Sequence, residues 1–192
     1  MSNIQTRRLE LIPASEEALR GELSGVAALA AALRCEVPST WPPDLYDSDA
    51  VNYSLNWLLA HPSQADWSFY YIVRRGSANL RPLLIGAGGF KGAADEHGMV
   101  EVGYSIVRDH QRLGYATEAV EGWLRFAFAS PDVKTVIGQT LPTLIASIGV
   151  LEKLGFTFAG AGSDPSVPEG EEVIRYEMTR AAFERRSHHG HL

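Results

Sequence analysis

The chain has 192 residues, of which 45% are apolar and 21% charged, and these proportions are typical of one compact globular domain. Its 17 Lys and Arg residues against 23 Asp and Glu residues give a formal net charge of -6, which argues against general binding to nucleic acid or anionic lipid and weakly favours a cationic partner. There is no run of about 18 apolar residues and no signal-peptide core, so we expect a cytoplasmic protein without a membrane partner.

The first third of the chain predicts an edge strand and two helices. Residues 6–12 alternate apolar and polar side chains and are stopped by a proline. Apolar residues at helical spacing then follow Ser15, a typical N-cap, and this helix ends before Pro38. A second helical segment covers residues 51–59. The two helices and the proline-rich linker between them, residues 38–49, form an aromatic-rich flap.

The remainder predicts a mixed α/β sheet. Three strand-like runs with short links, residues 68–73, 83–90 and 99–107, predict an antiparallel meander. The pattern then gives a helix at 116–127, a strand at 133–139, a helix at 144–151 closed by Gly155, and strands at 156–159 and 173–178. This order predicts a mostly antiparallel sheet with one parallel crossover. We assign residues 1–180 to a single domain and 181–192 to a basic tail.

Neither the tail nor the single cysteine gives a strong metal signal. The tail carries His188, His189 and His191, which could bind a metal, although a frayed terminus explains them better. Cys35 has no cysteine partner, so we expect a small core residue rather than a catalytic thiol. The sequence therefore predicts no metal cofactor.

A strand-to-helix turn around Gly114 is the most informative stretch. Such a turn directs unpaired backbone N–H groups and the positive end of a helix dipole at one point, which suits a phosphate. Arg112 and Thr117 would add a charged and a hydroxyl contact. A simple turn without a ligand is an equally good interpretation. The other glycine-rich run, residues 86–92, has the wrong spacing for a dinucleotide loop and predicts a closely packed strand.

The sequence from Gln111 to Ala116, Gln-Arg-Leu-Gly-Tyr-Ala, resembles the Gln/Arg-x-x-Gly-x-Gly/Ala signature of the GNAT superfamily of N-acetyltransferases. Residues 6–13, 101–104, 114–120 and 146–156 follow in the family's order and are similar to the branch that acetylates ribosomal-protein N-termini. The resemblance implies the GNAT fold, in which a mixed, mostly antiparallel sheet with splayed central strands is flanked by helices.

The same resemblance implies acetyl-CoA as cosubstrate and a primary amine as acceptor, either a protein N-terminus or a small molecule. Main-chain groups of Tyr104, Ser105, Ile106 and Val107 would hold the pantetheine arm of the coenzyme. The loop that would hold its pyrophosphate comprises Gln111, Arg112, Leu113, Gly114, Tyr115, Ala116 and Thr117. In this family the amine attacks the thioester directly, without an acyl-enzyme.

Glu101 is the first candidate for the general base. A lysine-like amine is only about one part in 2,500 neutral at pH 7, whereas an α-amine is roughly one part in seven, so a lysine acceptor depends more on a base. In a strand of period two, Glu101 shares a face with Gly103 and Ser105, and the resemblance places that strand beside the thioester. The alternative is an exposed strand charge or a partner for Arg8.

Ser147 occupies the position where the ribosomal-protein branch often has a serine near the coenzyme sulfur. Its hydroxyl would hydrogen-bond the departing thiolate, or it would bond back to a helix carbonyl. The chain departs from the family pattern at Leu151, where many members carry a tyrosine acid, and at Leu144, where an asparagine usually contacts the coenzyme. These departures leave open a coenzyme-binding sensor or interaction module without turnover.

The flap supplies the candidates for acceptor binding, namely Trp41, Tyr46 and Tyr53. Their ring faces, with the carboxylates of Asp44, Asp47 and Asp49, would hold a cationic amine. The polar residues 163–172 form the second flank of the acceptor pocket or a solvated hairpin. Apolar strand edges near the C-terminal end are compatible with a homodimer.

Overall fold

The computed structural model describes residues 3–44, 46–162 and 172–189, with side chains described up to Arg186. Within these residues one eight-stranded sheet has the order β1-β2-β3-β4-β5-β6-β8-β7. The strands are β1 (Ile4–Gln5), β2 (Leu9–Pro13), β3 (Phe69–Arg74), β4 (Leu83–Phe90), β5 (Met99–Ile106), β6 (Thr135–Thr140), β7 (Thr157–Ala161) and β8 (Ile174–Thr179). The helices are α1 (Glu16–Ser24), α2 (Val26–Leu33), α3 (Ser48–Ala60), α4 (Tyr115–Ala129), α5 (Ile145–Lys153) and α6 (Arg180–His189), with short 3-10 turns η1 (Pro62–Trp67) and η2 (Arg108–His110).

The sheet is mixed and mostly antiparallel, as predicted. Strands β3, β4 and β5 form the expected antiparallel meander, and β5 pairs with β6 in parallel after the chain has passed through α4. Gly86 and Gly88 of β4 lie so close to β5 that an added Cβ would stand 2.5 Å from a carbonyl oxygen of that strand. This close approach confirms that the glycine-rich run is a packed strand.

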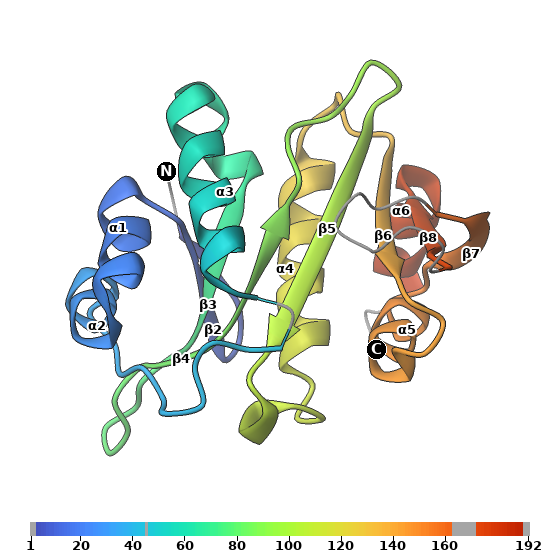
Figure 1. Ribbon diagram of the computed structural model, residues 1–192. Helices are drawn as coiled ribbons and strands as arrows, with labels where there is room; N and C mark the ends of the chain where they lie inside the picture. The colour runs from blue at the N-terminus through green and yellow to red at the C-terminus, as the bar shows by residue number, and fades with distance from the viewer. Residues whose placement is uncertain (1–2, 45, 163–171, 190–192) are drawn as a thin grey trace.

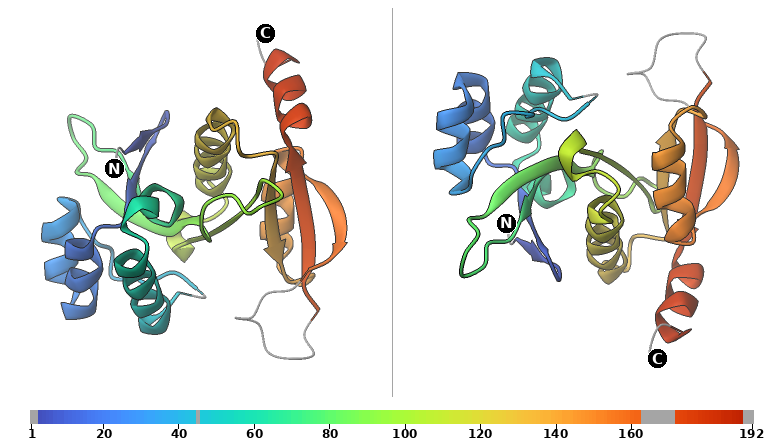
Figure 2. Two further views of the ribbon diagram at one scale, coloured as in Figure 1. Left: turned by 90° about the horizontal axis from the view of Figure 1, so that it is seen from above. Right: turned by 90° about the horizontal axis from the view of Figure 1, so that it is seen from below.

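Two layers of helices cover opposite faces of the sheet (Figures 1 and 2). Helix α4, drawn behind the strands in Figure 1, buries Trp123 and Leu124 in a core that also includes Leu151 of α5. Helices α1, α2 and α3 lie in front of the first strands, and residues such as Leu29 and Leu55 form a second core there. Cys35 is buried in this second core, as predicted, and burial raises the pKa of its thiol to about 11.

The structure corrects two predicted elements near the N-terminus. The single strand predicted at residues 6–12 is a hairpin, because the amide of Thr6 bonds to the Leu9 carbonyl (2.9 Å) and closes a turn between β1 and β2. The single helix predicted after Ser15 is two helices, because Gly25 adopts φ 127° and ends α1. Ser15 caps α1 as predicted, with its side chain accepting from the Ala18 amide.

Residues 180–189 form a helix, α6, and not the frayed tail that the sequence predicts. Arg180 fixes its start by donating to the carbonyl groups of Phe128, Ser130 and Val133. Phe183 stacks on Phe128 with ring centroids 4.8 Å apart. The histidine side chains of the tail lie outside the described part. Elsewhere in the described chain no three His, Cys, Asp or Glu residues are grouped to hold a metal, and no helix is long and apolar enough to cross a membrane.

Candidate active site

The central feature of the site is a gap between β5 and β6. Their parallel ladder begins at Met99 and Thr135 and ends at Val102 and Gly138. Beyond this point β5 continues along β4 to Ile106, whereas β6 continues along β8. Figure 1 shows the two strands parting toward the end where α5 lies. The splayed central strands expected for this sheet are therefore present.

The edge of β5 that borders the gap carries backbone groups that β6 does not pair. Val107 donates its amide to Ile85 on β4, and Glu101 accepts from the Lys91 amide on the same side. Because backbone groups alternate between the two edges of a strand, Tyr104 and Ile106 direct theirs toward the gap. Gln111 returns from the following loop to donate its Nε2 to the Ile106 carbonyl (2.9 Å).

The loop after β5 leads into α4 through two residues with left-handed backbone. Arg112 has φ 58° and Gly114 has φ 79°. The first hydrogen bond of α4 runs from the Glu118 amide to the Gly114 carbonyl, and no side chain caps the helix at Gly114. The amides of residues 114–117 precede that first bond, so they and the helix dipole make a suitable environment for an anion.

Arg8 braces this loop from the other end of the chain. Its Nε lies 2.6 Å from Oε2 of Glu118, and its Nη1 donates to the Leu113 carbonyl (3.0 Å). Its guanidinium also lies over the Tyr115 ring, 4.3 Å from the centroid. The second carboxylate oxygen of Glu118 accepts from the Arg8 amide and from the Thr6 hydroxyl, both at 2.6 Å. The partner of Arg8 is thus Glu118 and not Glu101.

A hollow of about 420 Å³ runs along α4 beside this brace. It is lined by four cationic residues, Arg7, Arg8, Arg125 and Lys153, together with Gly114 and Thr117 and with the carboxylates of Glu118 and Glu121. The lining therefore carries four positive against two negative side chains, a local excess of +2, although the whole chain has a net charge of -6.

Helix α5 lies across the gap from β5. Leu151 is 1% exposed and packs directly over Gly138 of β6, where an added Cβ would stand 2.8 Å from its side chain. Ser147, in the first turn of α5, meets Tyr104 of β5. The Tyr104 hydroxyl donates to the Ser147 carbonyl (3.1 Å) and lies 3.3 Å from the Ser147 hydroxyl. Leu144 precedes the helix with its side chain 37% exposed.

Glu101 lies on the opposite face of β5 from Tyr104, together with Gly103 and Ser105, as the period of two predicted. Its Oε1 lies 2.6 Å from the ammonium of Lys91, and its Oε2 accepts from Nε2 of Gln139 (2.9 Å). A Cβ added at Gly103 would meet no atom within 4 Å, so this face of the strand has free space beside the carboxylate.

A family model for the acetyltransferase (GNAT) domain matches residues 8–157. The chain belongs to the GNAT acetyltransferase family. YjdG of Bacillus subtilis (strain 168), an uncharacterized N-acetyltransferase, is 27% identical to it over 158 residues, which are 80% of this chain and 88% of the relative.

Two solved structures share the GNAT fold over nearly the whole chain. RimL, a ribosomal alpha-N-protein acetyltransferase in complex with coenzyme A, has a TM-score of 0.67 at 17% identity and covers 94% of this chain and 99% of that chain. A GNAT-family acetyltransferase from Bacillus anthracis has a TM-score of 0.64 at 16% identity, with the same coverages. Family membership makes this protein an acetyltransferase enzyme.

The flap of this GNAT enzyme is held together by a partly buried carboxylate that no sequence motif indicates. Glu22 of α1 accepts from Trp41 Nε1, from the Tyr46 hydroxyl and from the Tyr71 hydroxyl of β3, each at 2.8 Å. Burial raises the pKa of Glu22, and the three hydrogen bonds only partly oppose it. The polar ends of Trp41 and Tyr46 are therefore directed at Glu22, whereas Tyr53 on α3 is 69% exposed.

The linker of the flap rests on β5. The Ser105 hydroxyl donates to the Asp44 carbonyl (2.7 Å), and the Asp44 carboxylate lies 3.3 Å from Nε of Arg108. The flap thus forms one wall beside Gly103. The other predicted wall, residues 163–172, falls almost wholly outside the described residues.

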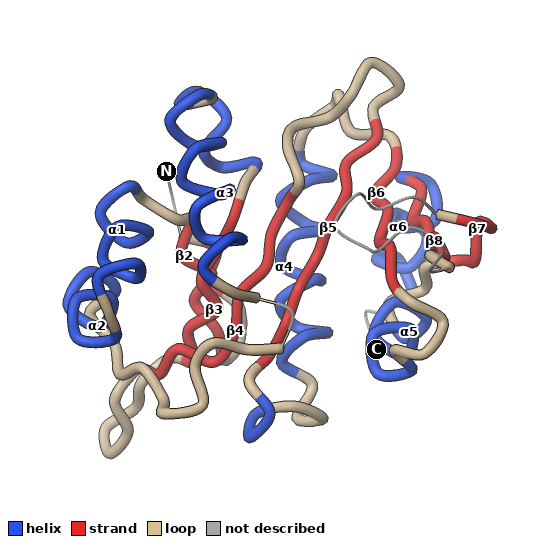
Figure 3. Tube along the Cα trace, in the orientation of Figure 1, coloured by secondary structure: helices blue, strands red, loops and turns tan. Residues whose placement is uncertain are grey.

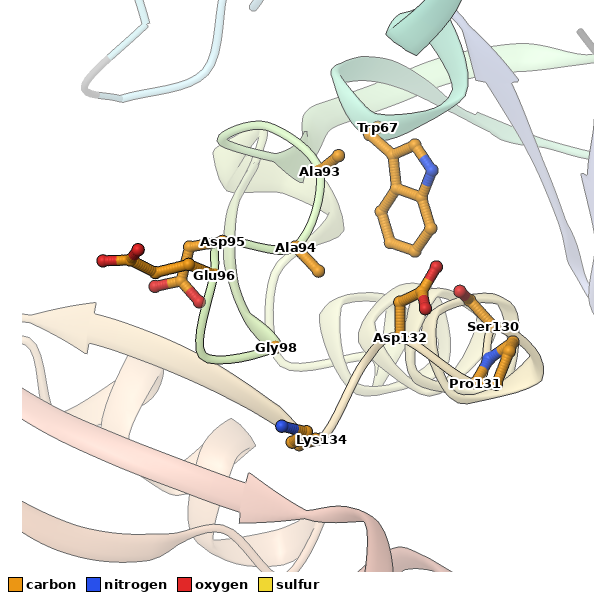
Figure 4. Close-up of a pocket in the computed structure, with 10 residues that line it drawn as sticks. All are labelled: Trp67, Ala93, Ala94, Asp95, Glu96, Gly98, Ser130, Pro131, Asp132 and Lys134. Carbon is orange, nitrogen blue, oxygen red and sulfur yellow. The ribbon is translucent and has the colours of Figure 1, made fainter.

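A second hollow, of about 430 Å³, lies at the far end of the sheet (Figure 4). It is bordered by Trp67, the β4–β5 connection and the segment between α4 and β6. The Asp95 carboxylate there accepts from the amides of His97 and Met99 and stabilises its own turn. In Figure 4 the side chains of Asp95 and Glu96 point away from Trp67 and Asp132. The hollow is remote from the open part of β5 and adds no group to the site.

Proposed function

We propose that this enzyme transfers the acetyl group of acetyl-CoA to a primary amine, by direct attack of the amine on the thioester. The observation that carries the proposal is the conjunction of an unpaired strand edge with an amide-rich loop. Tyr104 and Ile106 offer backbone groups to an extended arm, and residues 114–117 offer amides to a diphosphate. The residues present fit the coenzyme.

The reaction needs three contributions from the protein. The amine must lose a proton, the carbonyl oxygen must be stabilised as charge develops, and the sulfur must leave. Glu101 is the carboxylate beside the free space at Gly103, and in this proposal it accepts the amine's proton directly or through water. Ser147, on the far side of the gap, donates a hydrogen bond from its hydroxyl to the departing sulfur.

The acceptor enters from the face of β5 that carries Glu101, between the flap and β6. The carboxylates of Glu101 and Asp44 favour a cationic amine on this path. Both a protein N-terminus and a small amine meet this description. A coenzyme-binding module without turnover would share the donor site but would release no thiol.

A substitution in the loop tests the donor site. Gly114→Ala places a Cβ on a residue at φ 79°, which costs about 1–2 kcal/mol unless the loop moves. We expect the dissociation constant of acetyl-CoA, measured by calorimetry, to rise about ten-fold. Gly25→Ala is the matched control, because Gly25 also has positive φ but lies between α1 and α2.

An acceptor screen tests turnover. Thiol release from acetyl-CoA should be detected with at least one amine in a panel of peptides with free N-termini, amino acids and polyamines.

Unchanged coenzyme affinity in Gly114→Ala would refute the loop assignment. Tight coenzyme binding with no thiol release from any amine would favour the module without turnover.

A further inference from the structure

Within the described residues, Tyr104 is the side chain that links the open part of β5 to α5 by a hydrogen bond. Its hydroxyl donates to the carbonyl of Ser147 at 3.1 Å and also lies 3.3 Å from the hydroxyl of Ser147, a contact in which either oxygen can donate. A phenol has a single hydrogen, so rotation about its C–O bond can direct that hydrogen to either oxygen. The contact therefore has two states that differ by one rotation.

The surroundings keep the Tyr104 phenol protonated. The ring packs against the core formed by α4 and the sheet, and burial raises the pKa of its hydroxyl to about 12. The phenol is thus a hydrogen-bond donor throughout the pH range in which an amine acceptor is used. Proton transfer from a phenol of raised pKa to a thiolate, whose conjugate thiol has a pKa of about 8.5, is unfavourable, so the phenol acts as a hydrogen-bond donor.

The helix itself cannot supply such a donor. Leu151 stands one turn after Ser147, and its side chain is packed against Gly138 inside the core. A phenol at this point would have to displace that packing. The nearest phenol to the Ser147 hydroxyl in the described structure comes instead from the strand, on the other side of the gap.

We propose that Tyr104 is a positioning residue that orients the Ser147 hydroxyl toward the leaving sulfur. This inference rests on the proposed function. When the donor is bound, the Tyr104 O–H is directed at the Ser147 oxygen, and the Ser147 O–H is thereby free to donate to sulfur. The C–N bond forms as an electron pair of the carbonyl bond moves onto oxygen, and when that pair returns the C–S bond breaks with its electron pair remaining on sulfur. The amine's proton goes to Glu101. Tyr104 and Ser147 transfer no proton.

Kinetics of single and double variants test the coupling. Tyr104→Phe and Ser147→Ala should each lower kcat about five- to ten-fold, which is the effect of one hydrogen bond, and leave the KM for acetyl-CoA within about two-fold. The double variant should be no slower than Ser147→Ala alone, because Tyr104 acts only through Ser147. Tyr70→Phe is the matched control, since that buried phenol also donates to a backbone carbonyl, on Asp66 at 2.8 Å.

Two kinetic outcomes would overturn the proposal. Losses that multiply in the double variant would mean that Tyr104 and Ser147 act independently. A raised KM with unchanged kcat in Tyr104→Phe would mean that the phenol only holds α5 in place for coenzyme binding.

A thiol titration tests the same contact without turnover. Ser147→Cys introduces a thiol at the end of the Tyr104 hydrogen bond, and the native thiol, Cys35, is buried with a raised pKa. The pH dependence of alkylation by iodoacetamide should shift about one unit upward when Tyr104→Phe is added, because a hydrogen bond to a thiolate is lost.

An identical titration in both variants would overturn the proposed contact. Failure of the wild-type enzyme to acetylate any amine would instead refute the proposed function. The thiol titration alone would then decide whether Tyr104 donates to the side chain at position 147.

Discussion

Both carboxylate oxygens of Glu101 are held by side chains from neighbouring strands. Lys91, just beyond β4, contacts one oxygen, and Gln139 of β6 donates to the other. The carboxylate is therefore fixed at the point where β5 and β6 separate. A base with a fixed position needs no reorganisation when the amine arrives, which favours proton transfer.

Replacement of Glu101 tests its role as base. Glu101→Gln keeps the size of the side chain but cannot accept a proton. We expect kcat/KM to fall at least ten-fold near pH 6.5, where the amine is mostly protonated, and the deficit to shrink as pH approaches the pKa of the amine. Rates measured from pH 6 to 9 check this.

The control is Glu177→Gln, which removes a carboxylate on the same face of the sheet, on β8, and should leave the profile unchanged. Parallel profiles for the wild type and Glu101→Gln would exclude Glu101 as the base. Coenzyme affinity should be the same in all three proteins.

At the scale of elements, the β1–β2 turn and the start of α4 act as one unit. Arg8 and Thr6 of the turn converge on Glu118, and Arg8 continues to the Leu113 carbonyl. Burial raises the pKa of Glu118, but the hydrogen bonds from Thr6 and Arg8 outweigh burial, so the pKa lies below its usual range. The carboxylate is thus held charged beside the anion-binding loop, where its charge is neutralised by Arg8.

Loss of this charge should loosen the loop. Glu118→Gln should raise the dissociation constant of acetyl-CoA about three- to ten-fold and leave kcat nearly unchanged, since in the proposed function the loop amides bind the donor but do not touch the reacting atoms. Calorimetric titration and steady-state rates check the two quantities. Glu121→Gln, one turn further along α4, is the control, because Glu121 pairs with Arg125 and Arg186 and not with the loop.

The lowered pKa of Glu118 also determines how the free energy of unfolding changes with pH. A carboxyl group whose folded pKa is lowered stabilises the fold above its unfolded pKa, near 4.5, and loses that contribution as pH falls through the folded value. The free energy of unfolding of the wild type should therefore decline more steeply below pH 4.5 than that of Glu118→Gln. Equal slopes would contradict the pairing.

Elements with a clear side-chain period or motif could be predicted from the sequence, whereas those that depend on one backbone conformation or on distant contacts could not. The meander, α4 and the loop at Gly114 follow from side-chain period, glycine and the family motif. The boundary between α1 and α2 depends on the backbone of Gly25. Helix α6 depends on Arg180, which reaches carbonyl groups 47 to 52 residues away, such as that of Phe128. Neither feature produces a periodic pattern of side chains in the sequence.

The same distinction applies to the candidate site. The face of β5 that carries Glu101 follows from its period of two. Its partners Lys91 and Gln139, and the brace between Arg8 and Glu118, join strands and turns that are distant in the chain, so their roles could be found only in the folded structure.

At the scale of the whole molecule, Glu22 links three parts that surround the proposed acceptor side. It joins α1, the flap linker and β3 through Trp41, Tyr46 and Tyr71, and the linker in turn rests on β5. The three donors are neutral, so hydrogen bonds but no cation compensate the carboxylate for lost water. Burial consequently dominates and raises the pKa of Glu22.

This raised pKa predicts how stability changes with pH. Between the unfolded pKa, near 4.5, and the higher folded pKa, the folded protein binds more protons than the unfolded chain, so the contribution of Glu22 to stability falls as pH rises. Glu22→Gln removes this titration. Its free energy of unfolding, measured by urea denaturation, should decline less between about pH 5 and about pH 8 than that of the wild type.

Glu17→Gln, an exposed position on the same helix, is the control for the loss of a charge and should keep the slope of the wild type. A slope in Glu22→Gln equal to that of the wild type would show that Glu22 does not titrate in this window. The acceptor KM adds a second readout, because loosening of Trp41 and Tyr46 would move the flap wall but leave the loop at Gly114 in place. We therefore expect any kinetic effect of Glu22→Gln in the acceptor KM and none in coenzyme affinity.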